Sequence, residues 1–107
     1  MEFKELEGFS EEVVQLLSDA EYSGLQAELL VQPEKGKLIQ ETGGARKIRV
    51  AMQGRGKSGG ARVVYYYQVA DVIHFLFIYP KNSQENLTPK QTKWVRKMVD
   101  DIKEGRL

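Results

Sequence analysis

Apolar and polar positions recur with different periods along the chain, and each period predicts one type of element. Residues 72–79 form a nearly continuous run of aromatic and aliphatic residues, typical of a central strand buried on both faces. Residues 62–69 are rich in β-branched and aromatic residues, and residues 47–50 alternate basic and apolar side chains. We therefore expect two neighbouring strands here, and a short first strand at residues 2–6.

Helices are predicted by apolar stripes at helical spacing and by the capping residues before them. Ser10 is the expected N-cap of a short helix. Residues 18–21 have the form of a capping box that restarts a helix, which should end before Pro33. Residues 88–91 repeat the capping box before the last helix, with proline at the first helical position. The three apolar stripes are Val13, Leu16, Leu17 and Ala20; Tyr22, Leu25 and Leu29; and Val95, Met98, Val99 and Ile102.

Glycine-rich and turn segments separate the predicted strands. Four glycines within residues 54–60 predict a loop that carries Arg55 and Lys57, and Asp71 marks a tight turn. Residues 37–39 are expected to form a brief extended piece. The element order is therefore β-α-α-β-β-β-α. It predicts an α+β fold in one small domain spanning residues 1–107, with a mainly antiparallel sheet and helices on one face.

Charge is unevenly distributed, although the formal net charge is only +1. Residues 42–70 contain six basic residues and no acidic one, whereas residues 1–41 contain ten acidic residues and three lysines. A local field of one sign attracts polyanions whatever the total charge. Lys47 and Arg49, two apart on a predicted strand, should share a face, and Arg62 opens the next strand within reach of them. The open face of the sheet is therefore predicted to be a concave basic surface.

Composition excludes several kinds of site. The chain has no cysteine and one histidine, so disulfides, thiolate metal sites and a histidine-based zinc site are excluded, and we expect neither metal nor cofactor. No apolar run approaches the roughly 20 residues that span a bilayer. The first residues lack the apolar core of a signal peptide, so we expect a cytoplasmic protein without a membrane partner.

Two segments carry a resemblance to a known family: GGARKIRVAMQGRGKSGGARVVYYY at residues 43–67 and IYPKNSQENLTPKQ at residues 78–91. With the element order, they resemble bacterial type II toxins of the RelE/ParE superfamily, HigB-like branch, over nearly the whole chain. The resemblance implies a RelE-like fold and a metal-independent, ribosome-dependent endoribonuclease, an mRNA interferase that cuts mRNA in the A site of the 30S subunit and so inhibits translation. It also implies a cognate helix-turn-helix antitoxin (HigA-like), through which alone operator DNA would be bound.

The same resemblance implies which residues form the site. Metal-free RNA cleavage needs a base for the 2′-OH proton, positive charge on the phosphorane oxygens and an acid for the leaving 5′-oxygen. Matched by position, the expected catalytic residues are Lys47, Arg49, Lys57, Arg62 and Lys81. The expected RNA-binding residues are Arg46, Arg55, Tyr66 and Asn82. No tyrosine follows in the C-terminal segment, where this chain has Leu87, so the acid and base stay unassigned.

The histidine and the other aromatic residues of the chain are interpreted as structural. His74 lies within an apolar run and is interpreted as structural, Trp94 is interpreted as a packing residue, and Tyr65 and Tyr67 are expected to pack under the helices.

Two alternative functions remain open: a gyrase-poisoning toxin of the ParE kind, and a non-catalytic module that binds RNA or antitoxin. The basic pair on one strand, together with Arg62, favours the nuclease.

Overall fold

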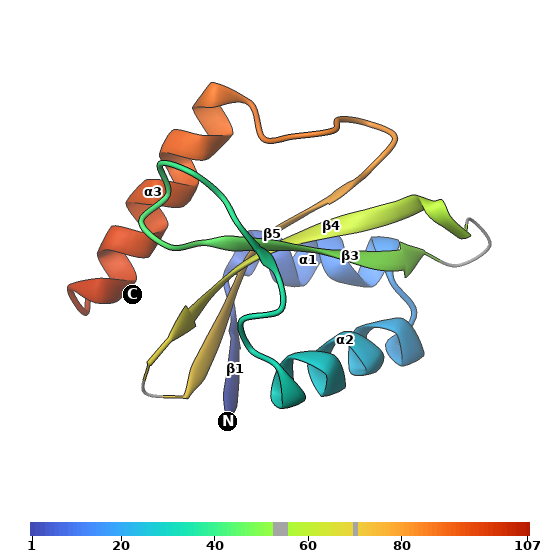
Figure 1. The fold of residues 1–107 in the computed structure, drawn as a ribbon, viewed down its shortest axis with the longest axis horizontal. Coiled ribbons are helices and arrows are strands. Elements are labelled where there is room, and N and C mark those ends of the chain that lie inside the picture. The colour runs from blue at the N-terminus through green and yellow to red at the C-terminus, as the bar shows by residue number, and fades with distance from the viewer. Residues whose placement is uncertain (53–55, 70) are drawn as a thin grey trace.

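Five strands and three helices make up the parts of the chain that the computed structural model describes, residues 1–52, 56–69 and 71–107 (Figure 1). Their bounds are β1 Glu2–Glu5, α1 Glu7–Leu16, α2 Asp19–Val31, β2 Lys37–Leu38, β3 Arg46–Met52, β4 Gly56–Gln68, β5 Val72–Pro80 and α3 Pro89–Lys103.

The strands form one sheet in the order β1-β5-β4-β3-β2. Only the β1–β5 pair is parallel among the described strands, and the other three pairs are antiparallel. The predicted α+β class and the mainly antiparallel sheet are therefore confirmed. The order differs by one strand, because the extended piece after α2 pairs with β3 over two residues, Lys37 opposite Lys47 and Leu38 opposite Arg46.

Two apolar clusters pack on opposite faces of the sheet. Val63 and Tyr65 of β4 belong to one cluster, whereas Val64 and Tyr66 belong to the other, and successive residues of a strand point to opposite faces. The first cluster is covered by α1 and α2 through Phe9, Val13, Leu25 and Leu29. The second is covered by α3 through Val95, Val99 and Ile102. The expectation of helices on one face thus holds for α1 and α2, while the apolar stripe of α3 packs on the other face.

The helix boundaries show which capping signals act. Both predicted capping boxes form: Ser18 and Thr88 each accept a hydrogen bond from the N–H of the residue three positions on. The prediction for Ser10 is wrong, because α1 already begins at Glu7 after Leu6, which makes no side-chain cap. The Ser10 hydroxyl lies inside the helix and contacts the Glu5 carboxylate and the Leu6 carbonyl instead.

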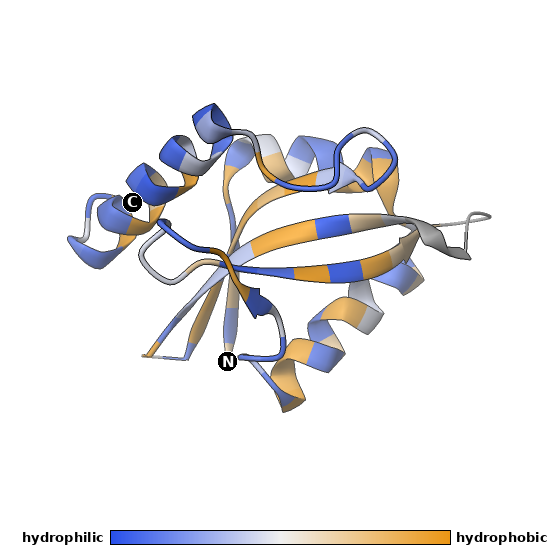
Figure 2. Ribbon diagram, turned by 45° about the horizontal axis from the view of Figure 1, so that its top comes forward, coloured by the Kyte–Doolittle hydropathy of each residue, from blue (hydrophilic) through white to orange (hydrophobic). Residues whose placement is uncertain are grey.

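The β3–β4 hairpin is longer than predicted. Pairing continues until Met52 lies opposite Gly56, so Gly56 and the later glycines belong to β4 rather than to a loop. The β3–β4 register is irregular here, because Val50 lies opposite Ala61 and Met52 opposite Gly56, which leaves extra residues on β4. Lys57 accordingly lies on a strand, and Arg55 lies outside the described residues. Figure 2 shows the alternation of hydrophilic and hydrophobic residues along β3.

A register shift between β4 and β5 changes which residues share a face. Val64 pairs with Phe77 and Tyr65 with Phe75, which leaves Leu76 as an extra residue. Leu76 and Ile78, although two residues apart on one strand, therefore belong to different clusters on opposite faces. His74, before the shift, is buried with its Nε2 atom 2.9 Å from Gln68 Oε1, and burial lowers the pKa of its ring.

Candidate functional site

A row of polar side chains crosses the middle of the sheet on the face that α3 partly covers. Arg49 of β3 lies opposite Arg62 of β4, and Arg62 lies opposite Tyr79 of β5. Lys47 lies one row away on the same face as Arg49, since Ile48 and Val50 are the buried residues of β3. The predicted grouping of Lys47, Arg49 and Arg62 on one face is thus confirmed.

The charge in this row is of one sign. Within the described residues, no Asp or Glu forms a salt bridge with Lys47, Arg49 or Arg62. Cations that are not neutralised by carboxylates create a local positive potential, which is the requirement for binding a phosphate group. In this respect the site agrees with the basic surface expected from the sequence.

Lys47 is held by the segment that follows β5. Its Nζ atom donates a hydrogen bond to Asn86 Oδ1 at 2.9 Å. Burial lowers the pKa of Lys47, and the charges of Arg62 and Lys37 lower it further, while Glu85 acts in the opposite direction. The segment carrying Glu85 and Asn86 therefore lies against the polar row, although neither residue was expected in the site.

Replacing Arg62 with glutamine should raise the pKa of Lys47, because a positive charge that disfavours the protonated amine is removed. The measurement is an NMR titration of the Lys47 Nζ resonance in both proteins. As a control, Arg96→Gln removes an arginine of α3 that pairs with Asp100 instead, and should leave the Lys47 titration unchanged. An unchanged pKa in Arg62→Gln would contradict the neighbourhood of the two side chains.

Tyr79 is the residue of this row that sequence reasoning missed. Its side chain is 3% exposed, and its hydroxyl has no hydrogen-bond partner among the described groups. The Nε atom of Arg62 is likewise buried without a partner. Burial raises the pKa of Tyr79, with Arg62 acting to lower it and Glu85 to raise it. Two unsatisfied polar atoms in opposing residues are unusual, because most buried polar groups are hydrogen-bonded.

Arg46, expected to bind RNA, faces the other side of the sheet from Lys47. Its Nη1 atom donates to the carbonyl oxygens of Gly36 at 2.8 Å and Glu34 at 3.0 Å. It lies opposite Tyr65, whose hydroxyl accepts from the Gly36 N–H and donates to the Pro33 carbonyl. Arg46 therefore fixes the turn between α2 and β2 and is not brought together with Lys47.

Tyr66 shares the face of Arg62 but lies under α3. Its ring stacks on His74 with centroids 6.3 Å apart, and Lys103 Nζ is 5.8 Å from its centroid. Lys103 also donates to the Gly43 carbonyl, which ties the end of α3 to the turn before β3. The predicted packing of Tyr65 and Tyr67 against α1 and α2 is confirmed, since both belong to the first cluster.

The two predicted residues after β5 lie next to the polar row. The Lys81 N–H donates to the Gly60 carbonyl at 2.8 Å, so the chain stays paired with β4 just beyond Tyr79. Lys81 is half-buried and Asn82 is exposed. Both are therefore available at the edge of the site.

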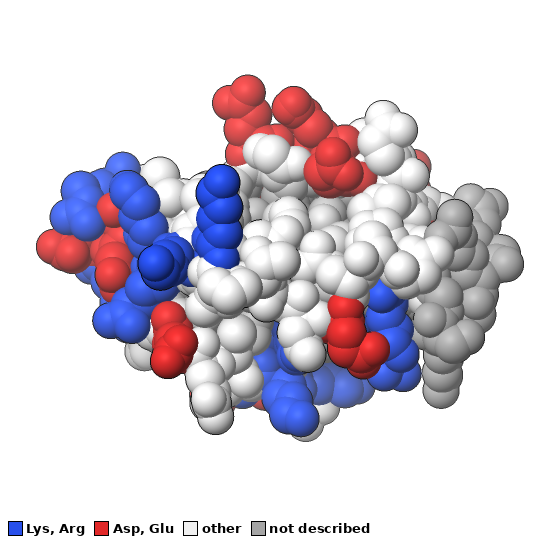
Figure 3. Space-filling model, turned by 90° about the horizontal axis from the view of Figure 1, so that it is seen from above, with Lys and Arg blue, Asp and Glu red and all other residues white. Residues whose placement is uncertain are grey.

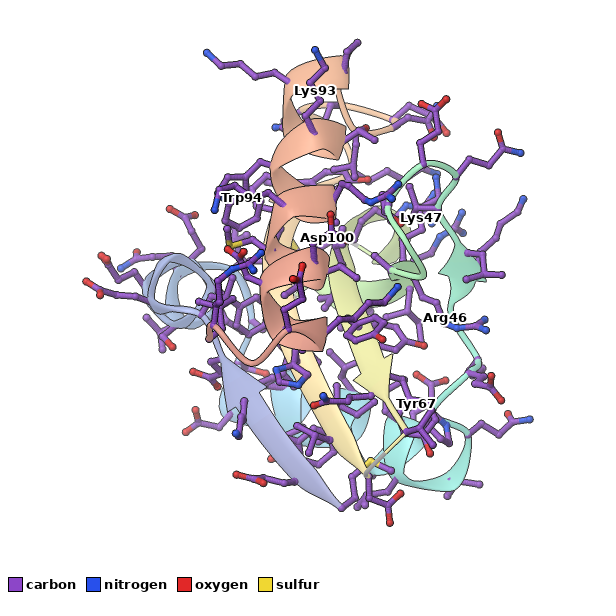
Figure 4. The ribbon with its side chains drawn as sticks, turned by 90° about the vertical axis from the view of Figure 1, so that its left-hand side faces the viewer. Arg46, Lys47, Tyr67, Lys93, Trp94 and Asp100 are labelled. Carbon is purple, nitrogen blue, oxygen red and sulfur yellow. The ribbon has the colours of Figure 1, made fainter. Side chains whose placement is uncertain are left out.

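Trp94 and the outer surface of α3 form separate features. Trp94 contacts Phe77 edge-on with centroids 6.3 Å apart and lines a groove of about 490 Å³ between α1 and α3, yet it stays 42% exposed. In Figure 4 it lies on one side of α3, and Lys47 lies on the other. Figure 3 shows Lys and Arg side chains gathered over the α3 end of the molecule. Asp and Glu side chains lie among them, and Arg96 and Lys97 pair with Asp100 and Asp101.

Within residues 1–52, 56–69 and 71–107, neither a metal site nor a helix that could cross a membrane is found. No group of three His, Cys, Asp or Glu side chains in these ranges is placed to hold a metal ion. Nor is any helix in them long and apolar enough to cross a membrane.

The geometry is that of a sheet with a cationic row on one face, and a comparison with protein families agrees with it. The family model described as the RelE toxin of the RelE/RelB toxin-antitoxin system matches residues 25–105. The chain belongs to the RelE toxin family. It is therefore a toxin of a toxin-antitoxin system, with an antitoxin as its partner. The match includes the whole polar row of this RelE-family chain, from Lys47 to Tyr79.

Proposed function

We propose that this RelE-family toxin is a ribosome-dependent mRNA interferase of the HigB-like branch, acting in the cytoplasm. The observation that carries the proposal is the row formed by Lys47, Arg49 and Arg62 on one face of the sheet, in which no residue forms a salt bridge with a carboxylate of the described chain. In metal-free RNA cleavage, cationic side chains must supply the positive charge that stabilises the phosphorane dianion. A row of this kind suits that task.

The proposed reaction is transesterification by the neighbouring 2′-OH. Lys47 is the proposed base, because its lowered pKa increases the fraction of neutral amine that can accept the 2′-OH proton. The 2′-oxygen attacks phosphorus while Arg49 and Arg62 balance the charge on the non-bridging oxygens. The P–O5′ bond then breaks, the 5′-oxygen takes a proton from Lys81, and a 2′,3′-cyclic phosphate remains.

Residues around the row are proposed to hold the RNA and the ribosome. Asn82 would contact a backbone phosphate near the cut, and the same role is proposed for Lys57 and Arg55, whose side chains lie outside the described part of the structure. The exposed side chains of Lys90 and Lys93 on α3 are further proposed phosphate contacts for ribosomal RNA. The antitoxin partner is proposed to be a HigA-like helix-turn-helix protein that covers the basic row and alone contacts operator DNA.

Purified protein should cleave mRNA on programmed ribosomes and cut the same mRNA slowly or not at all when it is free. The site holds lysines and arginines rather than a pair of groups that titrate near pH 7, so alignment of the substrate by the ribosome must supply much of the rate. The measurement is cleavage of a labelled mRNA with and without ribosomes. Rapid cleavage of free mRNA would contradict ribosome dependence.

Expression in cells distinguishes the proposed target from DNA gyrase. Induction should stop incorporation of labelled amino acids before incorporation of thymidine, and co-expression of the antitoxin should restore both. If incorporation of thymidine fails first, the toxin acts on gyrase and the proposed nuclease function is wrong.

A further inference from the structure

The buried polar atoms of the Arg62–Tyr79 pair are the least explained feature of the described chain. Arg62 and Tyr79 lie opposite each other on β4 and β5, and both Arg62 Nε and the Tyr79 hydroxyl oxygen are buried without a hydrogen-bond partner among the residues that the structure describes. A buried polar group left without a partner costs free energy. Packing alone does not require the hydroxyl, because phenylalanine has the same ring as Tyr79 without it.

The chemistry of the pair indicates what would satisfy it. Arg62 Nε–H is only a donor, and the Tyr79 hydroxyl keeps a proton to donate, because its ordinary pKa already lies well above neutral pH and burial raises that pKa. Two adjacent donors beside a guanidinium charge fit an acceptor that is anionic and carries several oxygens. A phosphate group has this chemistry, and charge-assisted hydrogen bonds to it are stronger than neutral ones.

The segment that follows β5 lies beside these atoms and contacts a cation of the same row. Asn86 accepts a hydrogen bond from Lys47, and Glu85 acts on the pKa values of both Lys47 and Tyr79. The segment after β5 therefore lies against the pair and holds one of the site's cations. A phosphate that takes Lys47 from Asn86 would replace a neutral acceptor by an anionic one.

We propose that Tyr79 is a further substrate-binding residue, whose hydroxyl donates a hydrogen bond to the same phosphate that Arg62 binds. The two residues then form a two-donor phosphate site at the centre of the polar row. The role of Tyr79 in cleavage rests on the proposed function, whereas its role in binding phosphate does not. The Tyr79 hydroxyl has no hydrogen-bond partner until phosphate binds. It should therefore lower the stability of the free protein and raise its affinity for phosphate.

The test is Tyr79→Phe, which removes only the hydroxyl. We expect its melting temperature to equal or exceed that of the wild type, because an unsatisfied buried group is removed. Its affinity for inorganic phosphate, followed by the Arg62 Nε–H resonance in an NMR titration, should fall by ~10- to 100-fold, the value of a hydrogen bond to a charged group. Single-turnover cleavage on ribosomes should fall by at least a similar factor.

Tyr67→Phe is the matched control, since Tyr67 is a tyrosine of β4 on the opposite face. It should change neither phosphate affinity nor cleavage. If Tyr79→Phe binds phosphate and cleaves like the wild type, or loses both together with a lower melting temperature, the proposal is overturned while the nuclease function stands. If the wild type does not cleave mRNA but Tyr79→Phe still loses phosphate affinity, the nuclease function fails and the phosphate site stands.

Discussion

Replacing Arg62 with alanine should lower single-turnover mRNA cleavage on programmed ribosomes by ~10²–10³, the usual loss for one preorganised donor at a developing oxyanion. Arg62 occupies the middle of the polar row, between Arg49 and Tyr79, where its guanidinium can bridge two oxygens of one phosphate. The variant should still fold, because the Arg62 side chain makes no salt bridge in the described structure. Toxicity on induction should disappear with the rate.

Arg46→Ala is the matched control for this prediction. Arg46 lies on the neighbouring strand but faces the other side of the sheet, where it donates to the Gly36 and Glu34 carbonyls. Its loss should lower the melting temperature and leave the cleavage rate of the folded protein near that of the wild type. Equal rate losses at Arg46 and Arg62 would contradict the placement of the active site on the face that carries Arg62.

Sequence periodicity predicts most of the fold because local signals and tertiary packing agree. The apolar run of β5 and the capping boxes of α2 and α3 each specify an element without help from distant residues. The start of α1 could not be predicted in this way. Leu6 offers no side-chain cap, and the turn from β1 into α1 is instead held by a hydrogen bond from the Leu6 N–H to the Phe75 carbonyl.

The face of α3 could not be predicted from its own stripe either. An apolar stripe shows that a helix packs on a sheet, but not on which side. That choice depends on the second cluster, in which Val95 and Val99 meet Val64 and Leu76. These sheet residues are available because the register shift near Phe75 turns Leu76 towards α3.

Some residues of the candidate site can be predicted from the sequence, and others cannot. Lys47, Arg49 and Arg62 follow from the two-residue period of a strand and from their order in the hairpin. Tyr79 does not, because in the sequence it ends an apolar run and is indistinguishable from a core residue. Its place opposite Arg62 depends on the β4–β5 register, which includes the shift. Asn86 joins the site only through the path of the segment after β5.

Replacing Phe75 with alanine should have the largest effect on stability, lowering the free energy of unfolding by ~3–5 kcal/mol. Phe75 is fully buried, and its ring stacks on Phe3 at 5.6 Å and Phe9 at 5.1 Å and meets the edge of Tyr22 at 5.6 Å. It thus joins β1, α1 and α2 to β5. Such a loss is a large fraction of the roughly 5–15 kcal/mol that stabilises a small domain.

The measurement is urea unfolding, in which the midpoint should fall strongly while the slope stays the same, as expected when stability changes without a change in unfolded surface. Phe77→Ala is the control, because Phe77 lies on the same strand and loses the same atoms but is only partly buried, beside Trp94 on the α3 face. Its loss should be clearly smaller, since less apolar area leaves water when it folds. Similar midpoints for the two variants would mean that the aromatic stack around Phe75 does not organise the core. Loss of toxicity in Phe75→Ala should then follow the folded fraction, whereas in Arg62→Ala it should not, and this difference separates a structural residue from a catalytic one.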